Sequence, residues 1–124
     1  MLKPLCAVPF GAALILFALL TQPWAAETGI ASIYTSRESR GFMACFIEGK
    51  ARKLDDGALT AAHKTRPCGT RLKVTNLNNR NTVLVTVTDR GPHIKGRIID
   101  LTKAGQAALA MGGLAPVKIE VVAE

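Results

Sequence analysis

The sequence predicts a small, mainly β domain, a β-barrel with one short α-helix. Several short apolar segments, rich in β-branched residues and separated by turn-forming residues, are typical of strands. Only residues 102–111 have the composition and flanking residues of a helix. Removing a predicted leader of 26 from the 124 residues leaves 98, which suits one domain.

The first 26 residues have the three-part pattern of a secretory signal peptide. Lys3 gives a positive start, and Cys6–Leu20 is apolar and uncharged. Small residues follow, which places cleavage near Ala25 or Ala26. The alternative is an uncleaved membrane anchor, but the apolar run is shorter than the roughly 20 residues that a spanning helix needs. Because Cys6 precedes the apolar core, no lipobox is evident, and we expect an exported protein of the periplasm or cell envelope.

The domain that we expect, residues 27–124, is basic. The formal charge falls only from +7 to +6 with the loss of Lys3. A basic exported domain suits an anionic polymer such as cell-wall material, lipid head groups or nucleic acid. Nucleic acid fits least, because basic residues form no run and Tyr34, Phe42 and Phe46 are too few aromatic residues for a stacking platform.

The first half of the domain alternates short strands with loops. We expect a strand at Ile30–Tyr34 and an apolar segment at Phe42–Ile47. The polar segment Glu48–Gly57 is predicted to be a loop or a frayed turn. Ala58–His63 fits either a short strand or one helical turn, and periodicity does not decide between them.

The second half contains the clearest β signals. Arg71–Asn76 alternates apolar and polar residues, as in a half-buried strand. Leu77–Asn81 is a hairpin link rich in Asn, and Thr82–Thr88 returns as a strand whose two faces are both covered. Ala115–Val122 is the last strand.

The helix is predicted over Thr102–Met111, because alanines, a leucine and a methionine form an apolar surface there. Asp100 or Thr102 can cap its N-terminus, and the Gly112–Gly113 pair ends it. For Asp100 this structural cap is the preferred interpretation, and catalysis is the alternative.

Asp89 is the first candidate for chemistry. It ends an apolar strand, and the Gly91–Pro92 pair then forces a turn. The carboxylate therefore sits at the mouth of a loop, close to Arg90 and Arg97, where a proton-transfer group contributes roughly 10²–10⁴-fold in rate. The alternatives are a solvated Asp paired with Arg and, for the two arginines, a solvated basic rim.

Cys45 and Cys68 remain once Cys6 is cleaved away, and export favours their pairing. A disulfide closing this 23-residue separation stabilises a domain by roughly 3 kcal/mol. The alternatives are a thiol nucleophile and a metal site. Two cysteines and two histidines without close ligand spacing argue against metal.

Five blocks in order give the chain its resemblance to a known family, and they are Gly29–Tyr34, Leu59–Lys64, Gly69–Asn76, Asp89–Pro92 and Gly96–Leu101. Together they resemble the rare lipoprotein A (RlpA-like) family over about Gly29–Val122. The resemblance implies a six-stranded double-psi β-barrel that works on peptidoglycan. The family includes lytic transglycosylases, in the best-studied members preferring strands without stem peptides.

Within that resemblance Asp89 matches the catalytic aspartate and His63 the family histidine. A lytic transglycosylase closes a 1,6-anhydro ring with the sugar's own C6 hydroxyl. One carboxyl group is then enough where ordinary glycosidases need two, and no cofactor is implied. His63 would position Asp89 or hydrogen-bond the substrate. A capping or core-edge histidine is the alternative.

The chain departs from the family at one position. Active members carry a glutamate eleven residues before the histidine, where this chain has Arg52, and Glu48 is the nearest glutamate. A cation there favours the ionised form of Asp89, which disfavours proton donation, but it suits binding of an anionic glycan or a stem-peptide carboxylate. The predicted substrate-binding residues are Arg90, Arg97, Arg52 and Thr60.

Three functions follow from these observations. The first is a transglycosylase that cuts MurNAc–GlcNAc bonds through Asp89 with His63. The second is a non-catalytic, expansin-like module that binds peptidoglycan. The third is an exported interaction protein unrelated to glycan. The expected partners are peptidoglycan glycan strands and envelope or cell-division proteins, and the expected state is a monomer.

Overall fold

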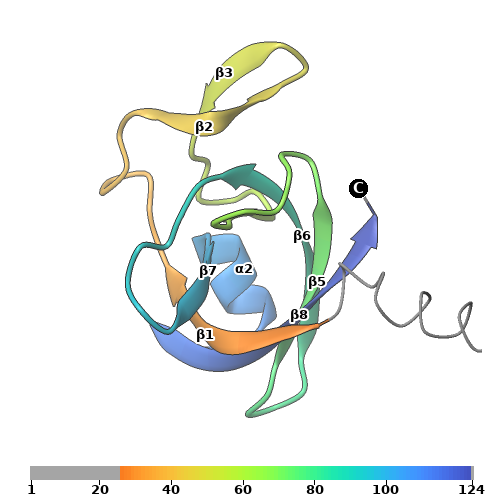
Figure 1. Cartoon of the computed structure of the whole chain (residues 1–124). Helices are drawn as coiled ribbons and strands as arrows, with labels where there is room; N and C mark the ends of the chain where they lie inside the picture. The colour runs from red at the N-terminus through yellow and green to blue at the C-terminus, as the bar shows by residue number, and fades with distance from the viewer. Residues whose placement is uncertain (1–25, 124) are drawn as a thin grey trace, which may run out of the picture.

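A computed structural model describes residues 26–123 of the chain (Figure 1). The predicted signal peptide, apart from Ala26, lies outside these residues. In the described part, no helix has the length and apolar character needed to cross a bilayer.

Six strands close into a barrel in the order β1-β7-β4-β6-β5-β8. Their bounds are β1 (Glu27–Ile33), β4 (Thr60–Ala62), β5 (Arg71–Asn76), β6 (Thr82–Asp89), β7 (Arg97–Leu101) and β8 (Leu114–Ala123). The pairs β1–β7 and β4–β6 are parallel, and the other four are antiparallel. The predicted fold, a mainly β six-stranded barrel with one short helix, is confirmed, and the segment at 58–63 forms a strand rather than a helical turn.

The barrel interior is aliphatic. Its buried cluster comprises Ala31, Ala61, Leu72, Val74, Val83, Val85, Val87, Ile99, Leu101, Leu109, Val117 and Ile119. Each fully buried Val, Leu or Ile contributes roughly 1.5–3 kcal/mol. The stability of the domain therefore comes mainly from the barrel.

The helix, α2 (Lys103–Ala108), is shorter than predicted and is capped by Thr102, not by Asp100. Thr102 has extended backbone angles, and its hydroxyl accepts from Gly105 N at 3.2 Å and donates to Ala58 O at 2.6 Å. Asp100 cannot cap because it lies within β7. The helix ends early because Ala110 adopts φ +48°.

A hairpin of β2 (Phe42–Ile47) and β3 (Lys50–Lys53) stands apart from the barrel, as Figure 1 shows. The prediction of a loop over 48–57 is therefore wrong for β3. Glu48 and Gly49 both have positive φ, as a two-residue type I′ turn requires, and this turn pairs β3 with β2. All four β3 side chains are exposed, so no apolar alternation marks the strand in the sequence.

Three contacts attach the hairpin to the barrel. The predicted disulfide between Cys45 and Cys68 is present. Ala44 N donates to Asp89 Oδ1 at 2.8 Å, and Thr88 Oγ1 lies 3.3 Å from Met43 Sδ. The disulfide is the covalent one of the three, so it limits how far the hairpin can move from the end of β6.

Replacing Cys45 and Cys68 together by Ala should lower the free energy of unfolding by roughly 3 kcal/mol, because the cross-link restricts the unfolded chain. Urea denaturation of the oxidised wild type and the double variant measures the difference. Reduced wild-type protein is the control and should unfold like the variant. Equal midpoints for oxidised and reduced wild type would contradict a stabilising disulfide.

Candidate functional site

Four neighbouring strands (β1, β7, β4 and β6) bring three polar residues to one level of the barrel, and we call these residues, Ser32, Asp100 and Asp89, the Asp89 row. Ala62 of β4 pairs with Asp89 of β6 on one side and with Asp100 of β7 on the other, and Asp100 pairs with Ser32 of β1. Because adjacent strands lie about 4.8 Å apart, the backbones of the two aspartates are roughly 10 Å apart. Both aspartates are half-buried.

The Asp89 carboxylate is held by three donors. Its Oδ1 accepts from Ala44 N at 2.8 Å and from its neighbour Arg90 N at 2.9 Å. Its Oδ2 lies 3.3 Å from the Tyr34 hydroxyl, which donates to it. Hydrogen bonds to a charged acceptor contribute about 1.5–3 kcal/mol each, so the carboxylate has a fixed orientation at the end of β6.

Tyr34 links the two aspartates electrostatically. Burial raises the pKa of its hydroxyl far above the ordinary value, and the charge of Asp89, its hydrogen bond and the charge of Asp100 raise it further. The phenol therefore stays protonated and keeps its donor. Ser32 Oγ donates to Asp100 Oδ1 in a short hydrogen bond. Sequence reasoning missed Tyr34 and Ser32, although polar groups at alternate positions ending an apolar strand are a usable signal.

The His63 side chain does not face Asp89 but caps a turn. Its ring is buried, Nδ1 accepts from Thr65 N at 3.1 Å and from Arg66 N at 3.0 Å, and Nε2 lies 2.9 Å from Glu27 Oε1. These are the hydrogen bonds of a capping histidine. His63 reaches Asp89 only through the backbone, where its N–H donates to Asp89 O at 3.1 Å.

Arg90 was expected to contact substrate, but its guanidinium holds the same turn. Its Nη1 donates to Arg66 O at 2.6 Å and to His63 O at 3.2 Å, and its Nη2 lies 3.5 Å from Cys68 Sγ. These contacts use the two N–H groups of Nη1 and one of Nη2, so the Arg90 guanidinium helps to hold the turn. Arg97 is also outside the row, because it begins β7, roughly 10 Å along the strand from Asp100.

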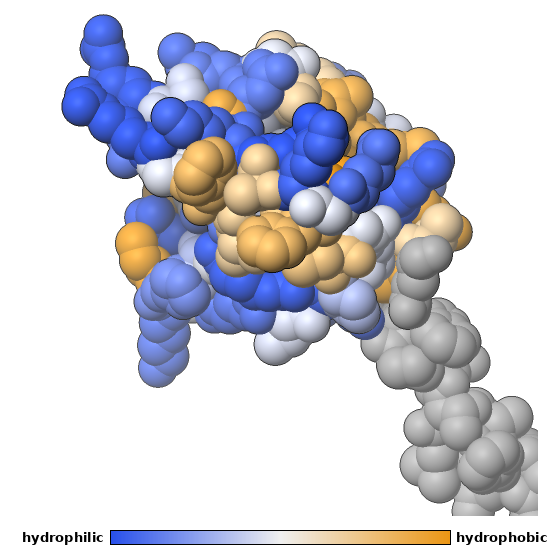
Figure 2. Space-filling view, turned by 90° about the horizontal axis from the view of Figure 1, so that it is seen from above, coloured by the Kyte–Doolittle hydropathy of each residue, from blue (hydrophilic) through white to orange (hydrophobic). Residues whose placement is uncertain are grey.

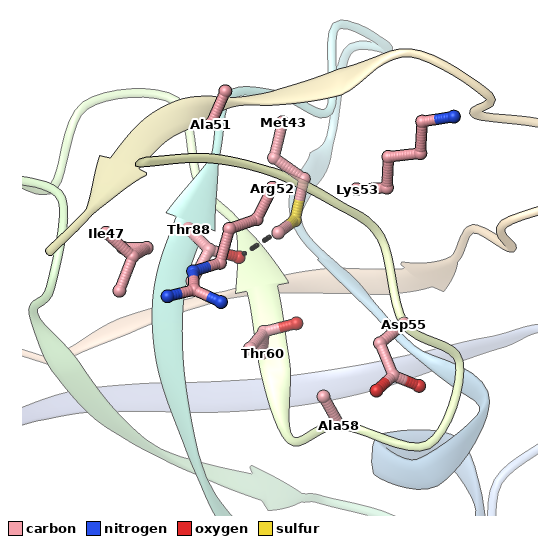
Figure 3. Close-up of a pocket in the computed structure, with 9 residues that line it drawn as sticks. All are labelled: Met43, Ile47, Ala51, Arg52, Lys53, Asp55, Ala58, Thr60 and Thr88. Atoms are coloured by element: carbon pink, nitrogen blue, oxygen red, sulfur yellow. Dashed lines mark hydrogen bonds between the residues drawn. The ribbon is translucent and has the colours of Figure 1, made fainter. Parts of the chain in front are cut away.

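A cavity of about 470 Å³ lies between the hairpin and the barrel, next to the Asp89 row (Figure 3). Arg52 and Thr60, predicted separately from the sequence, both line it. Figure 3 shows the Arg52 guanidinium pointing into the cavity and Lys53 pointing away. Thr60 Oγ1 is buried and has no hydrogen-bond partner among the described residues.

Thr88 and Met43 form the wall of the cavity on the Asp89 side. Thr88 directly precedes Asp89 in β6, and Met43 precedes Ala44, the donor to the carboxylate. The cavity and the carboxylate thus lie on either side of the contact between β2 and β6. Within residues 26–123, no group of three or more His, Cys, Asp or Glu side chains is placed to hold a metal ion.

Comparison with known sequences identifies the family of the chain. A family described as "Lytic transglycolase" matches residues 26–120. The endolytic peptidoglycan transglycosylase RlpA of Campylobacter jejuni is 56% identical over 70 residues, which cover 55% of this chain and 26% of that protein. Its namesake in Rickettsia felis is 43% identical over 100 residues, which cover 76% of this chain and 41% of that protein. The chain thus matches well under half the length of these relatives.

Solved structures share the fold. The Streptomyces papain inhibitor has a TM-score of 0.58 at 24% identity, covering 81% of this chain and 97% of its own. The apo expansin of Clavibacter michiganensis has a TM-score of 0.58 at 22% identity, covering 80% of this chain and 51% of its own. At these identities the likeness concerns the double-psi β-barrel alone.

The His63 turn should make stability depend on pH. Burial lowers the pKa of the imidazole from its ordinary 6.5, although the hydrogen bond and charge of Glu27 oppose this. Below about pH 6.5 the unfolded chain then binds more protons than the folded one, so the free energy of unfolding falls as the pH drops through this range. Urea titrations between pH 7.5 and 5 measure the slope.

Substitution H63N is the test variant, since an Asn oxygen can accept from the two turn amides without titrating. It should flatten the slope relative to that of the wild type. An unaltered slope in H63N would assign the pH dependence to other groups.

Proposed function

Because the chain belongs to the lytic transglycolase family of RlpA-like double-psi β-barrels, we propose that it cleaves peptidoglycan glycan strands as an endolytic transglycosylase. The observation that carries the proposal is the position of Asp89. Asp89 matches the family's aspartate in the resemblance, it is half-buried at the end of β6, and three donors orient it one residue after Thr88, which lines the cavity. The proposed site of action is the cell envelope.

The reaction needs one group that gives and then takes a proton. The Asp89 carboxyl protonates the oxygen that leaves with GlcNAc as the MurNAc–GlcNAc bond breaks. It then accepts the proton of the C6 hydroxyl, which attacks C1 of the same MurNAc and closes the 1,6-anhydro ring. The proton count of Asp89 is restored and no water is consumed, so a second carboxylate acting on water is unnecessary.

Residues around the row position Asp89. Tyr34 donates to its Oδ2, and the charge of Asp100 helps to keep Tyr34 protonated. His63 and Arg90 contribute by holding the turn whose first residue donates to Asp89 O. In this proposal His63 is a positioning residue, not a proton carrier.

Arg52 and Thr60 are the proposed substrate-binding residues of the cavity. The Arg52 guanidinium points into the cavity and can pair with a carboxylate of the wall polymer. Thr60 lines the same cavity. Recruitment by envelope or cell-division proteins, and action as a monomer, remain predictions from the resemblance.

An expansin-like module that binds the wall without cutting it is the second candidate. Arg52 favours it, because a cation stands where active family members have a glutamate and suits binding more than proton transfer. The same barrel in an expansin is consistent with this function. Product analysis separates the two candidates.

Substitution D89N should abolish cleavage, with a rate loss of roughly 10²–10⁴-fold, because the amide cannot shuttle a proton. Its oxygen can still accept from Ala44 N and Arg90 N, so the fold should persist. The assay incubates the protein with isolated sacculi and with peptide-free glycan strands, and mass spectrometry detects 1,6-anhydroMurNAc ends.

The matched control is E120Q, which removes a carboxylate from β8, where Glu120 pairs with Lys118. It should cleave like the wild type. Sacculus binding by wild-type protein without any anhydro products across pH would favour the binding module. Undiminished cleavage by D89N would overturn the assignment of Asp89.

A further inference from the structure

Two phenylalanines on the hairpin are exposed to an unusual degree. Phe42 is 66% and Phe46 70% exposed, the highest values among the large apolar residues described. Alternate residues of a strand share a face, so Phe42, Ala44 and Phe46 lie on the outer face of β2. Met43 and Cys45 occupy the inner, buried face. The exposure is therefore a property of one strand face.

Residues 26–123 contain three Tyr or Phe side chains and no Trp, and all three lie on segments that donate a hydrogen bond to Asp89. They are Tyr34, Phe42 and Phe46, and the buried core contains none of them. Tyr34 donates to one carboxylate oxygen, and Ala44, midway between the phenylalanines, donates to the other. The buried core of the domain is thus aliphatic, and its aromatic rings lie outside that core on the segments that hold Asp89.

The surroundings of these rings suit an amphipathic ligand. Figure 2 views the end of the molecule that carries the hairpin and shows apolar side chains next to hydrophilic ones. Lys53 lies 5.8 Å from the centre of the Phe42 ring. A pyranose has an apolar C–H face and a polar rim, which match a ring flanked by hydrogen-bonding groups. An apolar protein surface would leave the charged neighbours without partners.

We propose that Phe42 and Phe46 form a stacking face that binds sugar rings of a glycan strand next to Asp89. Both phenylalanines lie on one face of β2, and the irregularity of the strand between them leaves their β3 partners, Lys53 and Ala51, only two residues apart. The backbone N–H of Ala44, which lies between the two phenylalanines, holds the Asp89 carboxylate. This inference deepens the proposed function and rests on it for the identity of the glycan.

The test measures binding without cleavage. In a D89N background, isothermal titration with peptide-free glycan strands should show that F42A and F46A each raise Kd by about tenfold, the loss expected for one aromatic contact. The variants F42W and F46W, which keep an aromatic ring at each position, should bind glycan like their D89N parent. Because both side chains are exposed, urea midpoints should not change.

The matched control is L84A, which removes an apolar side chain that is 48% exposed on the barrel wall at β6. It should leave Kd unchanged. Equal binding by the double variant F42A/F46A and by its D89N parent would overturn the stacking face. Loss of self-association or of binding to anionic lipid vesicles, with glycan binding intact, would overturn it in favour of those partners.

The two proposals fail in different ways. Glycan binding that requires Phe42 and Phe46, without anhydro products from the chain with Asp89 intact, would support the stacking face and reject cleavage. A cleavage rate that is lost in D89N but unchanged in F42A/F46A would support the transglycosylase and reject the stacking face. Absence of glycan binding and of cleavage would reject both.

Discussion

The site depends on the register in which the short strand β4 lies between β6 and β7. Ala62 pairs with Asp89 on one side and with Asp100 on the other, so two distant parts of the chain reach the same level. A shift of one residue would turn these side chains to the opposite face. Ala61 and Ala62 are fully buried, and side chains this small let the three strands close tightly around β4. The barrel thus sets the geometry that the carboxylates share.

Much of this arrangement was predictable from local patterns. The alternation in 71–76, the β-branched run before Asp89 and the apolar helix surface each indicated an element that the structure contains. Asp89 stood out because an acidic residue ended that run, and the disulfide followed from export and two remaining cysteines. These signals lie within single segments of the chain, which is why the sequence alone reveals them.

The features that escaped prediction depend on contacts between distant segments. β3 carries no apolar alternation, because all four of its side chains are exposed and its position depends on backbone pairing with β2. The role of His63 depends on the contact of its ring with Glu27 and on the hydrogen bond that it accepts from Thr65 N. The histidine in the sequence indicates neither contact. Asp100 was expected at a helix end, but strand pairing extends to Leu101 and leaves Thr102 as the cap. Long-range pairing therefore overrides local capping propensity here.

The separation of the β2–β3 hairpin from the barrel has a consequence for how such proteins diverge. The hairpin forms a sheet of its own and contributes no strand to the closed ring, and no β3 side chain is buried in the core. Substitutions there, including a reversal of charge at position 52, leave the folding core almost untouched. Residues of the hairpin can therefore change during evolution between those that suit catalysis and those that suit binding, while the barrel fold stays the same.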